Sequence, residues 1–565
     1  MTPLTLHIDG REVEAIPGDT ILNAARKLGL DIPTLCFLEK CSPSTSCLVC
    51  LVKVKNGAQG KLVPSCATKV QPGMIVESET DEVRDARRTA LELLFSDHAG
   101  DCLSPCHRIC PLQMNIPLMI RQIESGRLDS AIVTIKAALA LPVVLGRLCH
   151  HPCENGCRRA TWDQAASIRE MERHVAEHDL ASRQPYLPRC QPATGKSVII
   201  VGSGPTGLAA ASHLAQAGHA CTVIDRHEEA GGSLGALDEP TLPRRLLQGE
   251  IDQLEKIGVQ FKYGVELGNH VSLEGLQRGF DAVLLATGEL LKDEARKLGL
   301  PVAAAGLKVD ASSGQVSPVQ AQEAQAGAAP NLSQVFAAGS AVKPVKQIVR
   351  AIGDGHLVAR SINQFLSGQK IARAEKPFSS IMGRLEDGEI DLFMRGPSAS
   401  PRVEPTCGGS AGFTDDEACA EAQRCLHCDC RAAGNCKLQH YAELYDADAG
   451  RFRQQRRRFE QEVPHADILF EPGKCILCGL CIQLAEQARE PLGLTFIDRG
   501  FDVRVSAPLN HTITEGLQKA AAECVKYCPT GALAFKKPEA ADPAKAFIGS
   551  EHCPFNQPTV VRNRK

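Results

Sequence analysis

The first eighty residues alternate apolar and polar positions in the way that is typical of paired strands. In LTLHIDGREVEAI the apolar residues fall on either side of Asp9-Gly10, a dipeptide that favours a tight hairpin turn. The segment ILNAARKLGL then spaces its apolar residues as a short helix does, and a cysteine-rich loop follows it. These patterns predict a small domain over residues 1–80.

The rest of the chain changes character several times. Residues 81–190 have a mainly helical pattern interrupted by Pro and Cys, and residues 195–290 read as strand, turn, helix and strand, an α/β pattern. Low-complexity sequence at 310–331 and the Pro-, Gly- and Ser-rich segment 395–412 are expected to be connections. The predicted domains are residues 1–80, 81–190, 191–375, 376–460 and 461–540, with a C-terminal tail over 541–565.

Composition narrows the functional classes. The 565 residues are 43% hydrophobic and carry a net charge of −3, so several cores are possible and no positive field favours nucleic acid. The N-terminal MTPLTLHIDG lacks a basic region followed by an apolar run, and AALALPVVLG is too short to span a bilayer. We therefore expect a cytoplasmic protein, in which 25 cysteines favour metal or redox chemistry over disulfides.

Most of these cysteines fall into five groups with the short spacings of iron–sulfur ligands. The first group is Cys36-x10-Cys47-x2-Cys50-x15-Cys66, in which a loop supplies three thiolates and a later strand the fourth, as a [2Fe–2S] cluster requires. Structural zinc is the alternative, and Cys41 is expected to be a non-ligand. The segment resembles the [2Fe–2S] domain that opens the large iron–sulfur subunit of respiratory complex I and of related hydrogenases.

The second and third groups interleave between residues 98 and 157. One run has the pattern H-x3-C-x3-C-x3-C-P from His98, and the other has the pattern C-x3-C-x3-C from Cys149. With the sequence GRLCHHPCENGC, they resemble the N-terminal domain of the glutamate synthase small subunit and of dihydropyrimidine dehydrogenase. The resemblance implies two [4Fe–4S] clusters that share these cysteines crosswise. One cluster would take Cys102, Cys106 and Cys157, and the other would take Cys110, Cys149 and Cys153.

Each of these two clusters is one ligand short, because the family's further upstream cysteine is missing here. The segment LELLFSDHAGDC resembles instead the complex I subunit, in which a histidine ligates a [4Fe–4S] cluster with His-x3-Cys spacing, so His98 is one candidate. SIREMER aligns Glu172 with a helix position that holds Gln or Glu in the family, which makes Glu172 the other. The alternatives are a surface or capping histidine and a solvated acidic residue.

The segment SVIIVGSGPTGLAAASHLAQAGHACTVID has the strand–turn–helix–strand context in which Gly-x-Gly-x-x-Gly binds a dinucleotide. Gly202 permits the turn, Gly204 lets the backbone approach a pyrophosphate, and Gly207 allows close helix packing. Asp225 would accept from ribose hydroxyls. EEAGG, FDAVLLATG and VFAAGSAV resemble the other FAD motifs of this flavoprotein family. The resulting cofactor-binding candidates are Gly202, Gly204, Pro205, Thr206, Gly207, Asp225, Gly231, Gly232, Thr287, Gly288, Gly339 and Ser340.

Two features depart from that family. Ser340 stands where the family has an aspartate that bonds to the cofactor. The family also inserts a nicotinamide-binding domain, with its own glycine fingerprint, between ATG and GLKVD. Here only a short peptide joins Gly288 to Gly306, and no second fingerprint occurs. The sequence therefore predicts FAD without an NAD(P)H site of the chain's own.

Two further cysteine groups lie near the C-terminus. RCLHCDCRAAGNCKLQ resembles a complex I motif, although it is longer, and four thiolates so close together favour a [4Fe–4S] cluster over zinc. KCILCGLC, with a distant cysteine in YCPTGAL, resembles another [4Fe–4S] cluster of that subunit. Cys407 and Cys419, either of which could replace one ligand, and Cys524 are expected to be spare. The expected ligands are Cys425, Cys428, Cys430 and Cys436 for one cluster, and Cys475, Cys478, Cys481 and Cys528 for the other.

Two smaller features are left over. RFRQQRRRF, from Arg451, is a basic run that is either a solvated face or a docking patch for an acidic partner. Cys190, Cys221 and Cys553 stand alone, and we expect them to be buried thiols.

Together the resemblances imply a chimera, in which a core like the glutamate synthase small subunit is flanked by ferredoxin modules like those of complex I. The expected fold is multidomain α/β and α+β: a β-grasp [2Fe–2S] domain, a helical double-[4Fe–4S] domain, a Rossmann-like FAD domain and C-terminal ferredoxin-like [4Fe–4S] modules. The expected cofactors are FAD, one [2Fe–2S] cluster and four [4Fe–4S] clusters.

Three functions are compatible with this content. The first is an electron-transfer subunit whose catalytic partner is a hydrogenase, a formate or aldehyde dehydrogenase, or a similar oxidoreductase. The second is an autonomous flavoenzyme that reduces a ferredoxin, a quinone or a small organic substrate, and the third is a non-catalytic redox sensor or scaffold. Neither nucleic acid nor direct membrane insertion is expected.

Overall fold

The computed structural model describes residues 3–56, 59–317, 331–372, 377–406, 408, 411–432, 435–454, 456–462 and 465–536. The predicted tail over 541–565, Cys407 and Cys553 lie outside these residues. The chain divides into two compact units. Unit 1 draws on Met1–Ser104, Lys376–Pro397 and Leu426–Ala541, and unit 2 draws on Pro105–Glu375 and Ser398–Cys425. Unit 2 is thus inserted in the sequence of unit 1, and the two units share the predicted segment 376–460.

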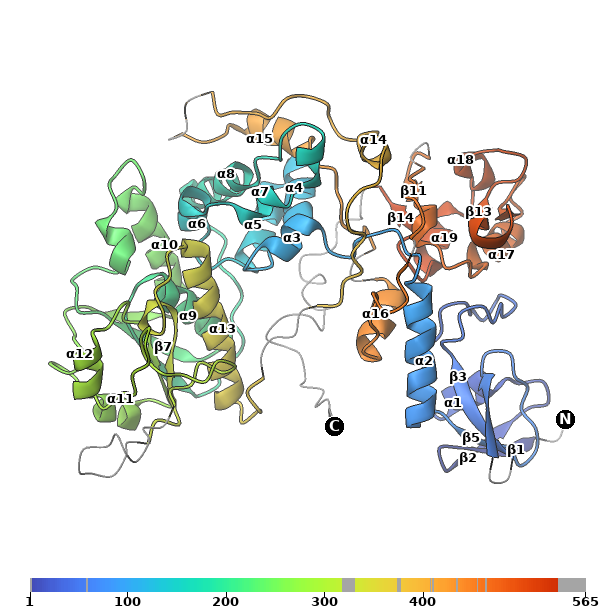
Figure 1. Cartoon of the computed structure of the whole chain (residues 1–565), viewed down its shortest axis with the longest axis horizontal. Coiled ribbons are helices and arrows are strands. Elements are labelled where there is room, and N and C mark those ends of the chain that lie inside the picture. The colour runs from blue at the N-terminus through green and yellow to red at the C-terminus, as the bar shows by residue number, and fades with distance from the viewer. Residues whose placement is uncertain are drawn as a thin grey trace. The chain divides into compact units, whose positions relative to one another are not determined.

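The N-terminal part of unit 1 consists of β1 (Leu4–Ile8), β2 (Arg11–Ala15), α1 (Ile21–Lys27), β3 (Leu51–Asn56), β4 (Gln59–Pro64) and β5 (Ile75–Glu77) (Figure 1). The strand order is β2-β1-β5-β3-β4, in which only the β1–β5 pair is parallel. The predicted hairpin is confirmed, because Asp9 and Gly10 have φ of 49° and 76° and Ile8 pairs with Arg11.

The amphipathic pattern explains why this sheet and α1 pack together. Leu6 and Ile8, on alternate positions of β1, are fully buried, as is Leu22 of α1. The helix begins at Thr20, whose side chain accepts a hydrogen bond from the backbone N–H of Asn23 at 3.2 Å. The predicted helix over this segment is therefore confirmed.

The rest of unit 1 contains short elements from three separate stretches of sequence. They are α2 (Asp81–Leu94), α14 (Glu389–Phe393), α16 (Lys437–Leu444), β11 (Ile468–Phe470), η4 (Pro472–Lys474), α17 (Leu480–Gln487), β12 (Thr495–Ile497), η5 (Gly500–Asp502), β13 (Arg504–Ser506), α18 (Ile513–Gly516), α19 (Ala521–Tyr527) and β14 (Leu533–Phe535). Antiparallel pairs join β11 to β14 and β12 to β13. Phe95, Leu438 and Phe470 belong to one hydrophobic core, which ties the N-terminal and C-terminal stretches together.

The basic run from Arg451 is solvated at Arg451 and Arg458 but not at its central arginines. Arg456 is mostly buried and its guanidinium bonds both carboxylate oxygens of Glu389, each at 2.6 Å. Arg457 pairs with Asp97 at 2.6 Å. These arginines link the last stretch of unit 1 to its central and first stretches, so both sequence-based interpretations of the run were wrong for its central residues.

The helical part of unit 2 consists of α3 (Pro105–Ile109), α4 (Ile116–Glu124), α5 (Leu128–Lys136), α6 (Pro142–Leu148), α7 (Pro152–Asn155), η1 (Arg158–Thr161), α8 (Ile168–Ala181) and α15 (Asp415–Ala422). The first seven confirm the mainly helical pattern predicted for this region. Glu250 satisfies the N-terminus of α6, since its carboxylate accepts from the N–H groups of Val143 (2.8 Å) and Val144 (3.0 Å).

The remainder of unit 2 is a Rossmann-like layer, with α9 and α13 adjacent in Figure 1. Its elements are β6 (Ser197–Val201), α9 (Pro205–Gln216), β7 (Ala220–Ile224), η2 (Gly232–Ala236), α10 (Arg244–Lys256), β8 (Gln260–Lys262), α11 (Leu273–Gly279), β9 (Ala282–Leu285), α12 (Lys292–Lys297), β10 (Val335–Ala337), η3 (Gly339–Ala341) and α13 (Ile348–Leu366). All five strands are parallel, in the order β10-β9-β6-β7-β8. Gly355 lets α13 pack closely on α9, because a Cβ there would lie 2.3 Å from the carbonyl oxygen of Thr206.

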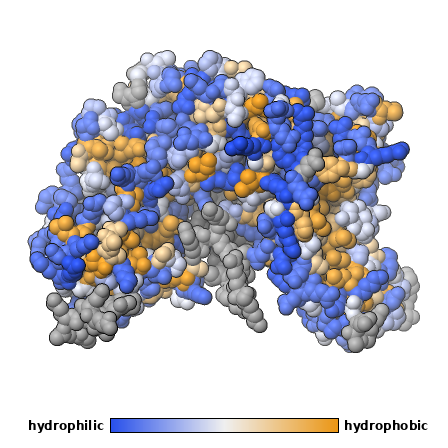
Figure 2. Space-filling view, viewed as in Figure 1, coloured by the Kyte–Doolittle hydropathy of each residue, from blue (hydrophilic) through white to orange (hydrophobic). Residues whose placement is uncertain are grey.

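The surface shows mixed polarity. Figure 2 shows hydrophilic and apolar side chains interspersed over the visible face. Exposed large apolar residues, such as Leu291 and Leu509, are scattered along the sequence. Among the described residues, no helix combines the length and the apolar character needed to cross a membrane.

Candidate functional site

The N-terminal cysteine group brings the loop between α1 and β3 together with Cys66, two residues after β4. Cys36, Cys47, Cys50 and Cys66 are each at most 3% exposed. The sulfur of Cys36 lies within hydrogen-bonding distance of those of Cys47 and Cys66, and Cys66 is bonded in turn to Cys50. These bonds lower the pKa of Cys36 and Cys50 and raise the pKa of Cys47 and Cys66. Four sulfurs so close together are the donor set that a [2Fe–2S] cluster uses.

Two of the cysteine loops contain a residue in the left-handed backbone conformation. Leu48, between Cys47 and Cys50, has φ of 53°, and Leu477, between Cys475 and Cys478, has φ of 54°. This left-handed conformation costs a residue with a side chain about 1 kcal/mol, so the surrounding structure must hold it in place. The N–H of Leu477 points at the Cys475 sulfur, 3.4 Å away. Hydrogen bonds to sulfur help to set the potential of a cluster.

Many expected ligands accept backbone hydrogen bonds at sulfur, although the thiol of one of them, Cys436, also donates to the carbonyl oxygen of Pro529 at 3.7 Å. The thiols of Cys221 and Cys524 donate to the carbonyl oxygens of His219 (3.5 Å) and Cys481 (3.7 Å). A thiolate ligand needs donors instead. The expected ligands whose sulfur accepts from a backbone N–H include Cys36, Cys47, Cys50, Cys102, Cys110, Cys149, Cys157, Cys430, Cys436, Cys475 and Cys478.

The isolated cysteines differ from one another. Cys221 is buried, as predicted. Cys190 is exposed, so the prediction of a buried thiol was wrong there. Within the described residues, no three His, Cys, Asp or Glu side chains converge as ligands of a single metal ion do. Ligands of an iron–sulfur cluster bind different irons, so they stand further apart than ligands of one ion.

Unit 2 brings Glu172 and three cysteines around one cavity. Cys110, Cys149, Cys153 and Glu172 line it, together with apolar residues. Glu172, on α8, is 8% exposed, and its Oε1 atom is buried without a hydrogen-bond partner. Burial raises the pKa of Glu172 to about 8. A buried carboxylate oxygen left unbonded is unfavourable unless something binds it, so this side chain is suited to be a fourth ligand.

Two of the other ligand sets inferred from sequence cross a boundary between the units, and they stay predictions. His98 and Cys102 belong to unit 1, whereas Cys106 and Cys157 belong to unit 2. Likewise, Cys425 belongs to unit 2, while Cys428, Cys430 and Cys436 belong to unit 1. The expected fourth group and one of the two crosswise groups are therefore each split between the units.

In unit 1, Cys102 lies beside two of the four cysteines of the distant motif at 425–436, namely Cys430 and Cys436. The N–H of Cys430 donates to the carbonyl oxygen of Cys102 at 3.3 Å. Burial raises the pKa of Cys102 to about 12, with the charge of Cys430 adding to the shift. The pKa of Cys436 is raised by burial and then by the charges of Cys430 and Cys102. Gly531 leaves room for this group, because a Cβ there would lie 2.2 Å from the Cys430 sulfur.

His98 lies four residues before Cys102 and is 8% exposed. Its ring packs edge-on against Phe95, with 5.5 Å between the ring centroids. Burial, with the charges of Lys474 and Arg453, lowers the pKa of His98 to about 3, so the imidazole is neutral. A neutral imidazole is the form that binds metal, and the alternative of a surface histidine is wrong.

In unit 2, Cys157 lies beside Cys425. Burial raises the pKa of Cys157, and the charge of Cys425 adds to the shift. Cys106 packs against the same core as Cys157 and Cys425, and its charge contributes to the raised pKa of Cys153 in the Glu172 group. The region that carries Cys425 is held firmly in unit 2, because the fully buried Arg424 bonds Glu421 (2.7 Å) and Asp163 (3.0 Å).

The last group, Cys475, Cys478, Cys481 and Cys528, lies at the start of α17 and at the end of α19. Burial and the mutual charges of these thiols raise the pKa of Cys478 and Cys481, and burial raises the pKa of Cys475 to about 11. The same group lies near both other groups of unit 1. The charge of Cys36 acts on Cys478, and the charge of Cys528 acts on Cys436.

The glycine fingerprint forms the turn between β6 and α9. Gly202 has φ of 108°, and a Cβ there would lie 2.3 Å from the carbonyl oxygen of Ala286. A Cβ on Gly207 would lie 2.0 Å from the carbonyl oxygen of Gly202. Gly204, at the N-cap of α9, has no atom within 4 Å of its would-be Cβ. The fold thus requires the outer glycines, and the middle one leaves space at a helix N-terminus, where a pyrophosphate binds.

The other expected nucleotide residues surround this turn. A Cβ on Gly232 would lie 3.0 Å from the Cα of Gly204, and one on Gly339 would lie 2.4 Å from Oγ1 of Thr206. Gly288 has φ of 77° and open space beside it. Pro205 begins α9, Gly231 donates its N–H to Ser203 O (3.0 Å), Thr287 donates to Gly288 O (3.3 Å), and Ser340 Oγ accepts from the N–H of Val345 (3.2 Å).

Asp225 follows β7, as expected, but its carboxylate already has four donors. Oδ2 accepts from the N–H (2.7 Å) and hydroxyl (2.6 Å) of Ser203, and Oδ1 accepts from the N–H (2.9 Å) and ring (2.8 Å) of His227. Although burial opposes ionisation, these bonds hold the pKa of Asp225 below its usual value. A ribose hydroxyl could replace the ring of His227, whose side chain is 59% exposed.

The two kinds of glycine in this turn give a matched pair of variants. Gly204→Val should weaken FAD binding by at least about tenfold while the melting temperature of the apoprotein changes little, because the side chain enters the space for the pyrophosphate. Gly207→Val should lower stability by about 1–3 kcal/mol, because its side chain meets the backbone of the turn. Flavin titration and thermal unfolding would check both. Unchanged flavin affinity in Gly204→Val would contradict the site.

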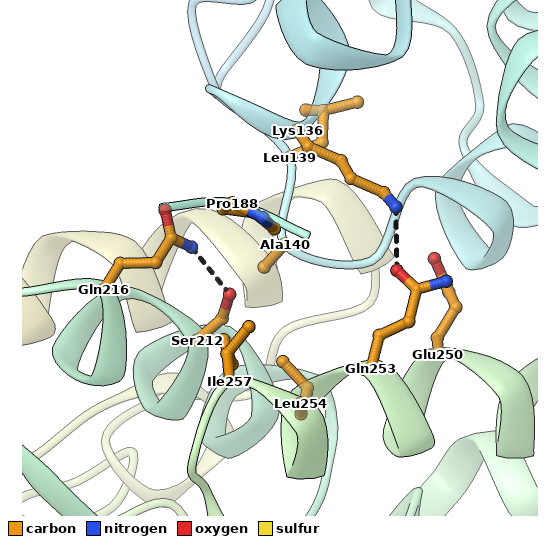
Figure 3. Close-up of a pocket in the computed structure, with 10 residues that line it drawn as sticks. All are labelled: Lys136, Leu139, Ala140, Pro188, Ser212, Gln216, Glu250, Gln253, Leu254 and Ile257. Carbon is orange, nitrogen blue, oxygen red and sulfur yellow. Dashed lines mark hydrogen bonds between the residues drawn. The ribbon is translucent and has the colours of Figure 1, made fainter. Parts of the chain in front are cut away.

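A separate cavity of unit 2 lies among α5, α9 and α10 (Figure 3). Its polar groups already bond to one another or to neighbours. Lys136 Nζ donates to Gln253 Oε1 (2.7 Å) and to Asp179 Oδ2 (2.6 Å), and Gln216 donates to Ser212 Oγ (3.1 Å). This cavity is a packing junction, and we assign no ligand to it.

Comparisons with known protein families agree with the domain types seen here. A 2Fe-2S iron-sulfur cluster binding domain matches residues 1–81, and dihydropyrimidine dehydrogenase domain II, 4Fe-4S cluster, matches residues 78–184. An NAD(P)-binding Rossmann-like domain matches residues 200–243. The chain is thus a multidomain protein with [2Fe–2S], [4Fe–4S] and Rossmann-like domains, as the sequence predicted.

Individual relatives are oxidoreductases. The chain is 35% identical over 207 residues to the NADP(+)-dependent formate dehydrogenase subunit beta of Moorella thermoacetica, over 33% of this chain and 29% of the relative. It is 38% identical over 188 residues to the NADPH-Fe(3+) oxidoreductase subunit beta of Geobacter sulfurreducens, over 33% of this chain and 28% of the relative. It is 38% identical over 192 residues to the glutamate synthase [NADPH] small chain of Mycobacterium tuberculosis, over 33% of this chain and 39% of the relative.

These matches are partial. The chain covers between 28% and 39% of the length of these three relatives. Among solved structures, NAD+-reducing [NiFe]-hydrogenase aligns over 96% of this chain and 91% of its own, with a TM-score of 0.34 and 13% identity.

Proposed function

We propose that this chain is an electron-transfer subunit of a multi-subunit oxidoreductase, with one FAD, one [2Fe–2S] cluster and four [4Fe–4S] clusters. The observation that carries the proposal is the sequence of cysteine groups in unit 1. Cys36 of the N-terminal group, Cys478 of the second group and Cys436 of the third all belong to one hydrophobic core or pack against it, and the charges of these groups act on one another. Redox groups gathered around one core suit electron transfer better than separate structural roles.

We further propose ligand sets that follow the two units. In unit 1, Cys102, Cys430 and Cys436 would hold a [4Fe–4S] cluster with His98 as the fourth ligand. In unit 2, one cluster would use Cys110, Cys149, Cys153 and Glu172, and another would use Cys106, Cys157 and Cys425. Cys428 stays a predicted ligand on its spacing alone. The [2Fe–2S] set and the set with Cys475, Cys478, Cys481 and Cys528 keep the grouping inferred from sequence.

The nucleotide in unit 2 is proposed to be FAD. The Rossmann fingerprint by itself fits FAD or NAD(P), and the choice rests on the later glycines near the turn. Gly232 and Gly339 approach Gly204 and Thr206 closely, and Gly288 borders open space. A flavin exchanges one or two electrons, whereas each cluster carries one, so it would connect two-electron chemistry with the clusters.

The partner is proposed to be a catalytic subunit that holds the substrate site. The relatives named as beta subunits of a formate dehydrogenase and of an NADPH-Fe(3+) oxidoreductase support a subunit role. An autonomous flavoenzyme is the second candidate, which the Rossmann-like domain favours. In the relay, the chain's own residues bind the redox groups, exclude water from them and set their potentials.

The experiment that tests this function isolates the complex through a tag on the full chain. Substrate of the copurified subunit should reduce the clusters of this chain, as seen by EPR. The Cys478→Ala variant should still assemble with that subunit but should pass fewer electrons to the [2Fe–2S] cluster, because one relay group is lost. Catalytic turnover of a substrate by the chain free of other subunits would favour the autonomous flavoenzyme instead.

A further inference from the structure

Unit 1 contains a buried ion pair next to its third cysteine group. Lys474, the last residue of η4, is 3% exposed, and its Nζ lies 2.5 Å from Oε2 of Glu471. Both side chains are almost fully buried. A buried pair of this kind adds little net stability, because the loss of hydration offsets the attraction. Its place beside redox ligands therefore calls for another explanation.

The Lys474 side chain packs directly on the loop that carries His98 and Cys102. A Cβ on Gly100, in the middle of this loop, would lie 2.5 Å from Cε of Lys474. The N–H of Ala99 donates to the carbonyl oxygen of Gly473 at 2.9 Å, and a Cβ on Gly473 would lie 2.7 Å from Cβ of Ala99. Gly100 and Gly473 thus allow η4 to pack against the loop that carries His98 and Cys102. This contact places the Lys474 side chain on that loop.

The charge of Lys474 affects the pKa of the ligands more than the charge of Glu471 does. For Cys430, Lys474 lowers the pKa and Glu471 raises it, with Lys474 the larger of the two after burial. Lys474 also acts against the raised pKa of Cys102 and lowers the pKa of His98. The other charged groups that act on these three ligands are Arg453 on His98, Asp101 on Cys102, and Asp429 on Cys430.

We propose that Lys474 is a tuning residue, whose fixed positive charge raises the reduction potential of the cluster held by Cys102, Cys430, Cys436 and His98. The inference rests on the proposed iron–sulfur function. Reduction adds negative charge to a cluster, and a buried ammonium nearby stabilises that charge in a medium of low dielectric constant. Glu471 opposes the effect and holds the ammonium in place. Burial and nearby charge are established determinants of cluster potential.

A purely structural role is the competing explanation, and unit 2 offers a control for it. Lys136 is also buried, at 6% exposed, and pairs with Asp179 at 2.6 Å. It lines the packing junction of Figure 3 rather than a cysteine group. Loss of a buried lysine from either place should destabilise its unit, and only the loss of Lys474 should change a cluster potential in unit 1.

The test is an EPR-monitored redox titration of the full chain prepared anaerobically. The relevant [4Fe–4S] signal is identified as the one that disappears in Cys430→Ala. Its midpoint potential should become more negative in Lys474→Met, remain near wild type in Lys474→Arg, and become more positive in Glu471→Gln. In the double variant Lys474→Met/Glu471→Gln the midpoint potential should return toward the wild-type value. In Lys136→Met it should equal the wild-type value.

Opposite shifts in Lys474→Met and Glu471→Gln would establish the tuning role. If the signal is present and neither variant moves it, the proposal is overturned while the proposed function stands. If Lys474→Met fails to assemble clusters, Glu471→Gln and Lys474→Arg decide the question, and an unshifted potential in Glu471→Gln rejects it. Wild-type protein that forms no [4Fe–4S] signal would instead refute the proposed function itself.

Discussion

The double variant Cys425→Ala/Cys430→Ala should lose two [4Fe–4S] clusters, about eight irons per chain, whereas each single variant loses about four. Cys425 lies beside Cys157 in unit 2, and Cys430 lies beside Cys102 and Cys436 in unit 1. Losses at independent sites add. Iron and sulfide analysis of anaerobic protein, which should give about eighteen irons for the wild type, measures the difference directly.

A matched double variant calibrates this measurement. Cys110→Ala/Cys149→Ala removes two ligands that line the same cavity, so it should lose about four irons, no more than either single variant. Cys190→Ala, at an exposed cysteine outside the predicted ligand sets, is the control and should leave the iron content unchanged. If the Cys425/Cys430 double variant also loses only about four irons, the grouping inferred from sequence is correct and the division between the units is not.

The flavin of the isolated chain should be bleached by dithionite and not by NADH or NADPH at catalytically useful rates. Hydride transfer needs the nicotinamide to be held against the flavin, and that alignment accounts for a large part of catalysis. Within the described residues, unit 2 contains one parallel Rossmann-like sheet, and one glycine fingerprint occurs in the sequence. That single fingerprint is the proposed FAD site, which leaves no second one for the nicotinamide.

Stopped-flow absorbance on protein shown free of other subunits measures this rate. Gly204→Val is the control, because it should remove the flavin signal without altering the iron content. Rapid bleaching by either nucleotide, lost in Gly204→Val, would contradict the prediction and favour the autonomous flavoenzyme.

Local sequence predicted the local structure well. The hairpin at Asp9-Gly10, the helix after Thr20 and the glycine turn before α9 are all formed by neighbouring residues whose backbone preferences agree with the final fold. The proximity of Cys110, Cys149, Cys153 and Glu172 also followed, because a family pattern joined the short segments that carry them.

The grouping of the remaining cysteines was harder, because spacing reports only on ligands that are close in sequence. The whole described part of unit 2 separates Cys102 from Cys430 in the sequence. Even so, the backbone N–H of Cys430 donates a hydrogen bond to the carbonyl oxygen of Cys102. A signal was present, since the segment at His98 and the segment ending in Cys436 each resemble the same subunit of complex I. Two halves of one motif of that subunit would give the set proposed for unit 1.

The basic run failed for a different reason. Its charge pattern suggested solvent or a partner, but the carboxylates that neutralise it, Asp97 and Glu389, lie in two other stretches of unit 1. Charge along a chain gives no indication of which distant acids will face it. Lys474 was missed similarly, because only the packing against Gly100 reveals its proximity to the ligands.

The backbone hydrogen bond between Cys102 and Cys430 has a consequence for the synthesis of the protein. About 330 residues separate the two, so a ribosome adding roughly 5–20 residues per second needs roughly 16–66 s to deliver the second cysteine after the first. The described part of unit 2 ends at Cys425, so it can fold on the nascent chain while unit 1 still lacks its last stretch. As a proposed iron ligand, the thiol of Cys102 must stay reduced throughout that interval, and the proposed cluster can be loaded only late in synthesis or after release.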